Sequence, residues 1–259
     1  MNCKIKSIHY FPVKSVSFQN IETSNIKKNL GMANDRIFAF SRGIDSNKSK
    51  LLEKDPNQRK LNNFLTLKNS PALNKYNFFY KNEKLTLTYQ EKELVTISPD
   101  NEEERLLLTN KLTELESSLS KPIILLKNKD FPFYDTSHSN KIFNSMSLVN
   151  LKSVDDFQSK INQKVEFERF RANFYVDGID AWEERNWIGK VIKINDVSFK
   201  VEQNIPRCVA INLKPKTDDN AINLLKSLKK NYNHFDMGIY LTALNDGKIL
   251  VNDKIELIQ

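Results

Sequence analysis

The fold is decided by the stretch VIKINDVSFKV, residues 191–201. Apolar residues alternate with polar ones on both sides of Asn195-Asp196, and a period of two is typical of a half-buried strand. Two such runs separated by a two-residue polar turn predict a β-hairpin. The second run leads, through the polar residues Glu202-Gln203-Asn204, toward Cys208.

Further strands and a few helices are predicted on both sides of this hairpin. The strand-like runs are residues 5–11, 36–40, 85–89, 93–97, 123–126, 167–176, 238–244 and 248–258, the last two around Asn245-Asp246-Gly247. Three helices are expected. One is capped by Asp100, one is capped by Ser147, and one begins at Asp218-Asp219. The pattern predicts a mostly β chain with some α: a smaller α+β domain over residues 1–121, then a β-barrel domain over residues 122–259.

Length and composition set wide limits on function. The chain has 259 residues, enough for one large or two small domains. Its 6 Gly and 8 Pro exclude a fibrous or low-complexity class. Lys and Arg exceed Asp and Glu by 40 to 32, a formal net charge of +8. Spread lysines indicate a solvated surface, and they would also attract a phosphate, a nucleic acid or an acidic partner protein.

The number of cysteines and the sequence that follows Met1 indicate the cellular compartment of the protein. Cys3 and Cys208 are the two cysteines, too few for a disulfide framework. No signal-peptide core follows Met1, and no apolar run approaches the length of a membrane span. We expect a cytoplasmic protein with free thiols and no membrane span.

Cys208 ends the polar run Asn204-Ile205-Pro206-Arg207-Cys208. A thiol beside a cation, on a loop, favours the thiolate form. Thiolate is a soft ligand, suited to a metal that oxygen ligands hold poorly. The alternative is an inert buried cysteine.

Five motifs follow one another in the second half of the chain. They are Arg169-Phe170-Arg171-Ala172-Asn173-Phe174, Trp182-Glu183-Glu184 with Trp187, Pro206-Arg207-Cys208, Gly238-Ile239-Tyr240, and Gly247-Lys248-Ile249 with Asn252-Asp253-Lys254. In this order they resemble a MOSC domain, the domain of molybdenum-cofactor sulfurase C-termini. Earlier, Phe11-Pro12-Val13-Lys14-Ser15, Gly31 and Asp35-Arg36 resemble the β-barrel-type domain that precedes MOSC in one branch. That branch includes the mitochondrial amidoxime-reducing component and its bacterial counterparts.

The resemblance implies a molybdenum cofactor, a pyranopterin with a phosphate and a dithiolene-bound metal. It makes Cys208 the metal ligand and the catalytic residue. The positions it implies for cofactor binding are Lys14, Ser15, Arg36, Asn144, Ser147, Arg171, Asn173 and Arg207. Arg and Lys suit a phosphate, because they offer charge-assisted hydrogen bonds.

Each of these residues also has an ordinary structural interpretation. Lys14 could be a surface lysine, and Arg36 could form an ion pair with Asp35 at a strand end. Arg171 and Asn173 alternate with phenylalanines and could face solvent. Trp182 and Trp187 could belong to the core or to a lid, and His138 to a polar loop. The set as a whole, rather than any one member, favours the cofactor site.

The sequence departs from the family pattern at a few positions. Ala172 stands where the family usually has Pro, Asn144 where Ser or Thr is common, Met237 where Phe is common, and Asn252 where Gly is common. The sequence shows no ferredoxin-type cysteine cluster. It also shows no pyridoxal-phosphate domain, so pyridoxal phosphate is a superfamily association only. We therefore expect electrons to come from a separate ferredoxin-like or cytochrome-like protein.

Three functions remain open. The first is a molybdenum oxidoreductase that reduces N-oxygenated or N-hydroxylated small molecules. The second is a non-catalytic cofactor or sulfur carrier that relays through Cys208. The third, a nucleic-acid-binding β module, ranks last, since basic residues do not cluster with interleaved aromatics, and no nucleic-acid partner is expected. The first is favoured, because the Lys14-Ser15 and Asp35-Arg36 motifs occur in the reductase branch.

Overall fold

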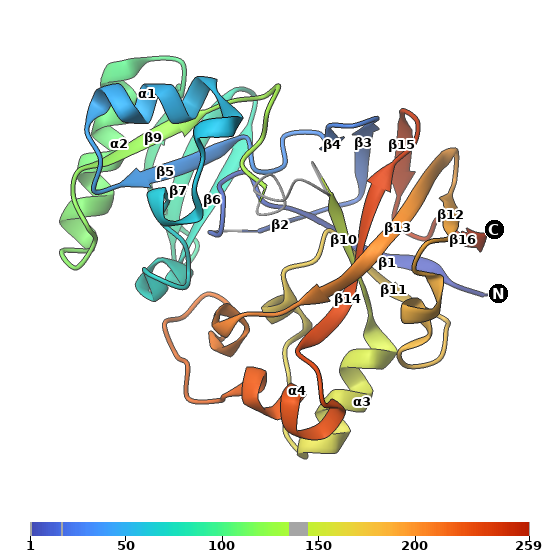
Figure 1. Cartoon of the computed structure of the whole chain (residues 1–259). Helices are drawn as coiled ribbons and strands as arrows, with labels where there is room; N and C mark the ends of the chain where they lie inside the picture. Colours follow the sequence, from blue (N-terminus) through green and yellow to red (C-terminus); the bar gives the residue numbers. More distant parts are fainter. Residues whose placement is uncertain (1, 17, 135–144, 259) are drawn as a thin grey trace.

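The computed structural model describes residues 2–16, 18–134 and 145–258. Its largest sheet has eight strands in the order β16-β12-β13-β14-β10-β11-β1-β2 (Figure 1). In chain order the bounds are β1 Lys4–Tyr10, β2 Gln19–Ile21, β10 Met146–Asn150, β11 Phe174–Asp177, β12 Val191–Ile194, β13 Val197–Pro206, β14 Asp236–Ala243 and β16 Ile255–Leu257. Neighbouring strands are antiparallel except β10 and β11, which are parallel.

The start of β1, which β2 does not cover, is joined to the β16 side of the sheet, and this gives the sheet a barrel-like form. The Ile5 N–H donates to the Asp253 carbonyl at 2.9 Å, and the Asn252 N–H donates to the Ile5 carbonyl at 2.9 Å. The Ile255 N–H donates to the Cys3 carbonyl, also at 2.9 Å. The start of β1 is thereby joined to the segment that leads into β16.

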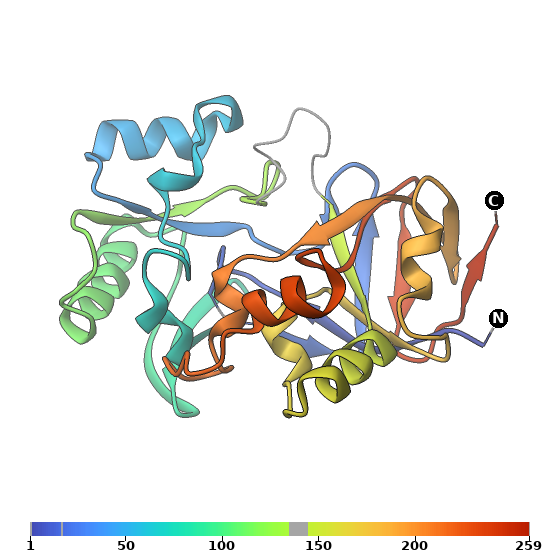
Figure 2. The ribbon, with the colours of Figure 1, turned by 60° about the horizontal axis from the view of Figure 1, so that its bottom comes forward.

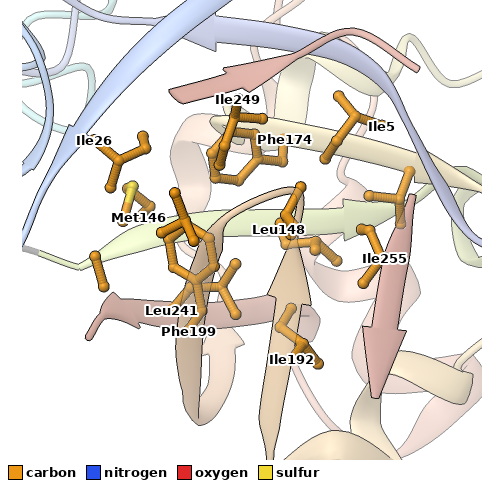
Figure 3. Packing of buried hydrophobic residues seen from close by; sticks show 14 of the residues in the cluster. Ile5, Ile26, Met146, Leu148, Phe174, Ile192, Phe199, Leu241, Ile249 and Ile255 are labelled. Atoms are coloured by element: carbon orange, nitrogen blue, oxygen red, sulfur yellow. The ribbon is translucent and has the colours of Figure 1, made fainter. Parts of the chain in front are cut away.

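A three-stranded antiparallel sheet packs against the eight-stranded sheet and shares its hydrophobic core. It has the order β15-β3-β4, with β3 Thr23–Lys27, β4 Gly31–Met32 and β15 Gly247–Leu250. Figure 3 shows the apolar side chains that meet between the two sheets, and all of these are buried: Ile5, Ile26, Met146, Leu148, Phe174, Ile192, Phe199, Leu241, Ile249 and Ile255. Burial of apolar surface on this scale is what stabilises a β-barrel.

Apart from the barrel, the structure has an α+β part, which is called the first lobe because most of it comes from the first half of the chain. It holds the antiparallel pair β5 (Phe38–Arg42) and β9 (Ile123–Lys127), and the antiparallel meander β6 (Tyr76–Lys81), β7 (Lys84–Tyr89), β8 (Lys92–Ile97). Its helices are α1 (Ser46–Lys54) and α2 (Glu102–Leu115), with the short 3-10 turns η1 (Pro56–Gln58), η2 (Leu61–Asn63) and η3 (Pro71–Lys75). It has a hydrophobic core of its own.

The barrel together with α3 (Leu151–Ile161) and α4 (Leu224–Tyr232) is called the second lobe. It also carries the 3-10 turns η5 (Phe167–Phe170), η6 (Glu183–Trp187) and η7 (Val209–Asn212). Figures 1 and 2 show the lobes side by side, with both chain termini at the end of the second lobe that is remote from the first. The mostly β fold with an α+β part and a barrel is confirmed.

The chain passes between the lobes more than once. Strands β1 to β4 come from the first part of the chain but pair within the barrel, and β9 pairs with β5 of the first lobe. The division at residues 121/122 therefore stays a prediction about sequence domains. In space, strands from before this boundary pair within the barrel, and β9, from after the boundary, pairs within the first lobe.

The predicted helices exist, but two of their caps were assigned to the wrong residues. Asn101 caps α2, since its side chain accepts from the N–H groups of Glu103 and Glu104. Asn150 caps α3 by accepting from the Lys152 N–H. Asparagine is as good an N-cap as aspartate or serine, so the sequence could not decide between neighbouring candidates. Ser147, the expected cap of α3, lies inside β10.

The observed helices and strands differ from the predicted ones in four other segments. Helix α1 was not predicted; its N-cap Asp45 stands before a polar run. Residues 167–176 split into η5 and β11 instead of one strand. Helix α4 begins after Asn223, later than Asp218. The last predicted strand splits into β15 and β16, which pair with β3 and β12 rather than with each other.

Candidate functional site

A cavity of about 600 Å³ lies between the two lobes. The first lobe contributes residues from the end of β5 and from the segment 61–69. The second lobe contributes residues from β10, η5, the end of β13, η7 and β14. A pocket of this size between two bodies of structure is the usual place for a small-molecule or cofactor site.

The cavity is strongly cationic. Its described lining residues include seven cations and no Asp or Glu: Lys14, Arg36, Arg42, Lys68, Arg169, Arg171 and Arg207. Cations in a concave, low-dielectric site focus positive potential and attract anions. The lining therefore favours an anionic ligand.

Most of the residues predicted for the site do line this one cavity. They are Lys14, Ser15, Arg36, Ser147, Arg171, Arg207 and Cys208, which are widely separated in the sequence. Asn173 lies directly behind the wall instead. Asn144 and His138 fall outside the described residues.

Three of these residues share an unusual backbone conformation. Ser15, Arg36 and Arg171 have φ of 62°, 53° and 49°. A residue other than glycine adopts this left-handed region infrequently, and such positions concentrate at functional sites. The ring of Phe11 lies beneath two of them, with the guanidinium carbons of Arg36 and Arg171 at 4.3 and 4.8 Å from its centre. Both cations are thus held against the same aromatic surface.

Asp35, Arg36, Asn173 and Ser147 form one buried network. Arg36 Nη1 donates to Asp35 Oδ2, and at 3.3 Å to Asn173 Oδ1. Asn173 Nδ2 donates to Asp35 Oδ2 at 3.0 Å, while Asn173 Oδ1 accepts from the N–H and from the hydroxyl of Ser147, both at 3.1 Å. Burial raises the pKa of Asp35, and its hydrogen bonds and the Arg36 charge oppose that rise.

This network answers two structural questions that the sequence left open, one about an ion pair of Arg36 and one about the exposure of Asn173. Arg36 does form the ion pair with Asp35, yet it also lines the cavity. Asn173 is fully buried, so it does not face solvent. Its contacts make it a residue that positions Arg36 and Ser147.

Lys14 is buried, not a surface lysine, with 2% of its area exposed. Its Nζ donates to the Phe133 carbonyl at 3.0 Å and lies 5.8 Å from the centre of the Phe64 ring. The Phe133 N–H in turn donates to the Arg36 carbonyl at 2.7 Å. The cation at Lys14 is therefore fixed at the cavity wall.

Cys208 is half-buried and occupies the N-cap position of η7. The preceding Arg207 directs its guanidinium toward backbone carbonyls: Nε donates to Met237 at 2.8 Å and Nη1 donates to Phe170 at 2.6 Å. Burial lowers the pKa of Arg207. These bonds tie the end of β13 to β14 and η5, and so fix the loop that presents the thiol.

Comparison with known proteins now identifies the family. The model of the MOSC N-terminal beta barrel domain matches residues 2–119, and the model of the MOSC domain matches residues 135–256. The chain is a MOSC-domain protein. The boundaries of the two matched domains follow the sequence and not the two spatial lobes.

The relatives of this MOSC protein match it over limited stretches. Mitochondrial amidoxime reducing component 2 of Rattus norvegicus is 36% identical over 70 residues, which is 27% of this chain and 20% of the rat protein. The human protein of the same name is 34% identical over 65 residues, 25% of this chain and 19% of its own length. Among solved structures, the YUAD protein from Bacillus subtilis aligns over 99% of this chain and 96% of its own, with 12% identity and a TM-score of 0.48.

The cavity of this MOSC protein fits a phosphate-bearing molybdenum cofactor by the chemistry of its side chains. Lys14, Arg36 and Arg171 are fixed cations that suit a phosphate. Ser15 and Ser147 add hydroxyl groups, and Cys208 adds a soft sulfur ligand at the same cavity. Within the described ranges, no three His, Cys, Asp or Glu side chains gather as a metal-ligand group.

Several lining residues were missed at the sequence level. Arg42 and Lys68 belong to no recognised motif, so nothing in the sequence placed them here. Arg169 and Tyr240 stand inside motifs that were recognised, and their neighbours were chosen instead. Arg169 links η5 to η7, because its Nη1 donates to the Asn212 carbonyl at 2.7 Å while its Nε pairs with Glu166.

The two tryptophans belong to the core. Trp187 is fully buried in the barrel core. Trp182 packs on Tyr232 with ring centres 4.5 Å apart, and its Nε1 donates to Asp156. Neither lines the cavity. In the part of the chain that the structure describes, no helix is both long and apolar enough to cross a membrane.

Proposed function

We propose that this MOSC protein binds the molybdenum cofactor in the cavity between the lobes and reduces N-hydroxylated compounds. The observation that carries the proposal is the convergence of fixed cations with the Cys208 thiol on one cavity. Lys14, Arg36 and Arg171 would hold the phosphate, and Cys208 would ligate the metal. The bound cofactor supplies two-electron redox chemistry for cleavage of an N–O bond.

The reaction balances with an external electron donor. An N-hydroxylated compound takes up two electrons and two protons, its N–O bond breaks, and an N–H compound and water leave. The protein would bind and orient the substrate beside the Cys208 thiol at the cavity wall. The electrons come from a separate reduced electron-transfer protein, of a ferredoxin-like or cytochrome-like kind.

The test is purification from a host that makes the cofactor, followed by elemental analysis and turnover. Wild-type protein should contain molybdenum and reduce benzamidoxime with reduced viologen as a chemical donor. Cys208→Ser should lose turnover, because a hydroxyl is a poor replacement for a thiolate. Cys3→Ala is the control for loss of a thiol, since Cys3 is buried in the barrel core and does not line the cavity.

The outcomes separate the candidate functions. Molybdenum without turnover by any donor would favour the carrier that relays through Cys208. No molybdenum in wild-type protein would contradict the reductase and the cofactor carrier, and would leave only the sulfur carrier. NADH or NADPH alone should not support turnover, whereas an acidic redox protein with its reductase should, and added salt should slow it. A cytoplasmic location is part of this proposal.

A further inference from the structure

The cavity carries more positive charge than a cofactor phosphate requires. Beyond Lys14, Arg36 and Arg171, two more cations line it from the first lobe, Arg42 and Lys68. Arg42 is the last residue of β5, and its Nη2 donates to the Ser120 hydroxyl at 2.8 Å. Within the described residues, the structure gives Lys68 neither a hydrogen bond nor an ion pair, and its side chain is exposed.

The segment that carries Lys68 is well fixed. The Leu65 N–H donates to the Phe40 carbonyl of β5 at 2.9 Å. Asn69 closes the turn, because its Oδ1 accepts from the Thr66 N–H at 2.9 Å and its Nδ2 donates to the Phe64 carbonyl at 3.0 Å. The backbone at Lys68 is therefore held in place at the cavity wall.

The other cations of the lining are engaged by protein groups. Arg169 pairs with Glu166, and Arg207 donates to backbone carbonyls. No carboxylate is among the described residues that line the cavity. With a phosphate at Lys14, Arg36 and Arg171, the charges of Arg42 and Lys68 would remain uncompensated. A cavity with uncompensated cations and fixed walls selects a ligand with negative charge.

We propose that the first-lobe wall, residues Arg42 and 61–69, is a substrate subsite that selects N-hydroxylated compounds bearing a carboxylate or phosphate, and that Lys68 determines this preference. The inference rests on the proposed function. Lys68 acts on the anionic group of the substrate and not on the N–O bond.

The test compares benzamidoxime with 4-carboxybenzamidoxime, which differ by one anionic group at a distance from the reacting bond. Turnover is measured with reduced viologen, so that no protein partner contributes. The wild-type cofactor-loaded protein should prefer the carboxylate compound in kcat/KM. Lys68→Glu should lower kcat/KM for that compound by about tenfold, mainly through KM, and leave benzamidoxime nearly unchanged. Lys60→Glu is the control, since Lys60 is an exposed lysine of the same region that does not line the cavity.

Calorimetric binding of both compounds to the same variants supplies a second readout, which does not need turnover. Tighter binding of the carboxylate compound to wild type than to Lys68→Glu would support the subsite even if no reduction occurred. Absence of reduction by wild type would count against the proposed function alone. Equal effects of Lys68→Glu on both compounds would overturn the subsite. So would the absence of any effect of Lys68→Glu on either compound.

Discussion

Asn173→Ala is the substitution that best tests how the cavity wall is built. The amide of Asn173 makes five hydrogen bonds to nitrogen and oxygen partners: it donates to the His9 carbonyl and to Asp35, and it accepts from Arg36 and twice from Ser147. A neutral hydrogen bond contributes about 1 kcal/mol net, and one to a charged group about 1.5–3 kcal/mol. The sum is reduced because the bonds share partners. We expect a loss of about 3–4 kcal/mol in the free energy of unfolding.

The assay is urea unfolding at neutral pH, with Asn173→Asp and Asn231→Ala alongside. Asn173→Asp keeps the shape but places a second carboxylate against Asp35, so it should not restore stability. Asn231 is exposed on α4, with a hydrogen bond to the Ser227 carbonyl, so its replacement should change stability by less than about 0.5 kcal/mol. A loss below about 1 kcal/mol for Asn173→Ala would refute the role given to the buried network.

Three further predictions concern other charged residues. Arg59→Met should lower the free energy of unfolding by about 3–5 kcal/mol. The buried Arg59 guanidinium lies 3.9 Å from the centre of the Phe133 ring, and it donates to the backbone carbonyls of Leu52, Glu53, Phe131 and Pro132. Lys60→Met, the control at an exposed site, should leave the free energy of unfolding nearly unchanged. Burial raises the pKa of Glu184 above its usual value of 4.5, so the folded state binds its proton more tightly than the unfolded state does. Glu184 therefore stabilises wild type relative to Glu184→Gln below pH 4.5, and this contribution should be lost as pH rises through the folded pKa; parallel pH profiles for the two proteins would contradict this. Arg171→Ala should lower molybdenum content by about tenfold or more with the unfolding midpoint little changed; unchanged molybdenum with a lower midpoint would make Arg171 a structural residue.

The sequence predicted the elements whose pattern is local. The hairpin at Asn195-Asp196 is present because alternation and turn agree there, and β12 pairs with β13 in the expected register. The cap of α3 could not be predicted, because Ser147 and Asn150 are equally good caps in isolation. The structure shows that Ser147 does not cap α3, because Ser147 lies in β10 and its hydroxyl donates to Asn173.

The lining of the candidate cavity was predicted in part, because only some of its residues belong to recognisable motifs. Motifs placed Lys14, Arg36, Arg171 and Cys208 together, and they line one cavity. The first-lobe wall with Arg42 and 61–69 was not predicted, since it depends on how the two lobes pack and no local pattern encodes that packing. The pairing of β15 with β3 was missed because it joins strands more than two hundred residues apart in the chain.

The most direct test of the central claim is X-ray absorption at the molybdenum edge of the purified protein, with wild type compared to Cys208→Ser. The proposal predicts that the metal in wild type has one more sulfur ligand than the metal in Cys208→Ser, at similar molybdenum content. An identical sulfur coordination in the two proteins would show that Cys208 does not ligate the metal, and would contradict the assignment of the cavity.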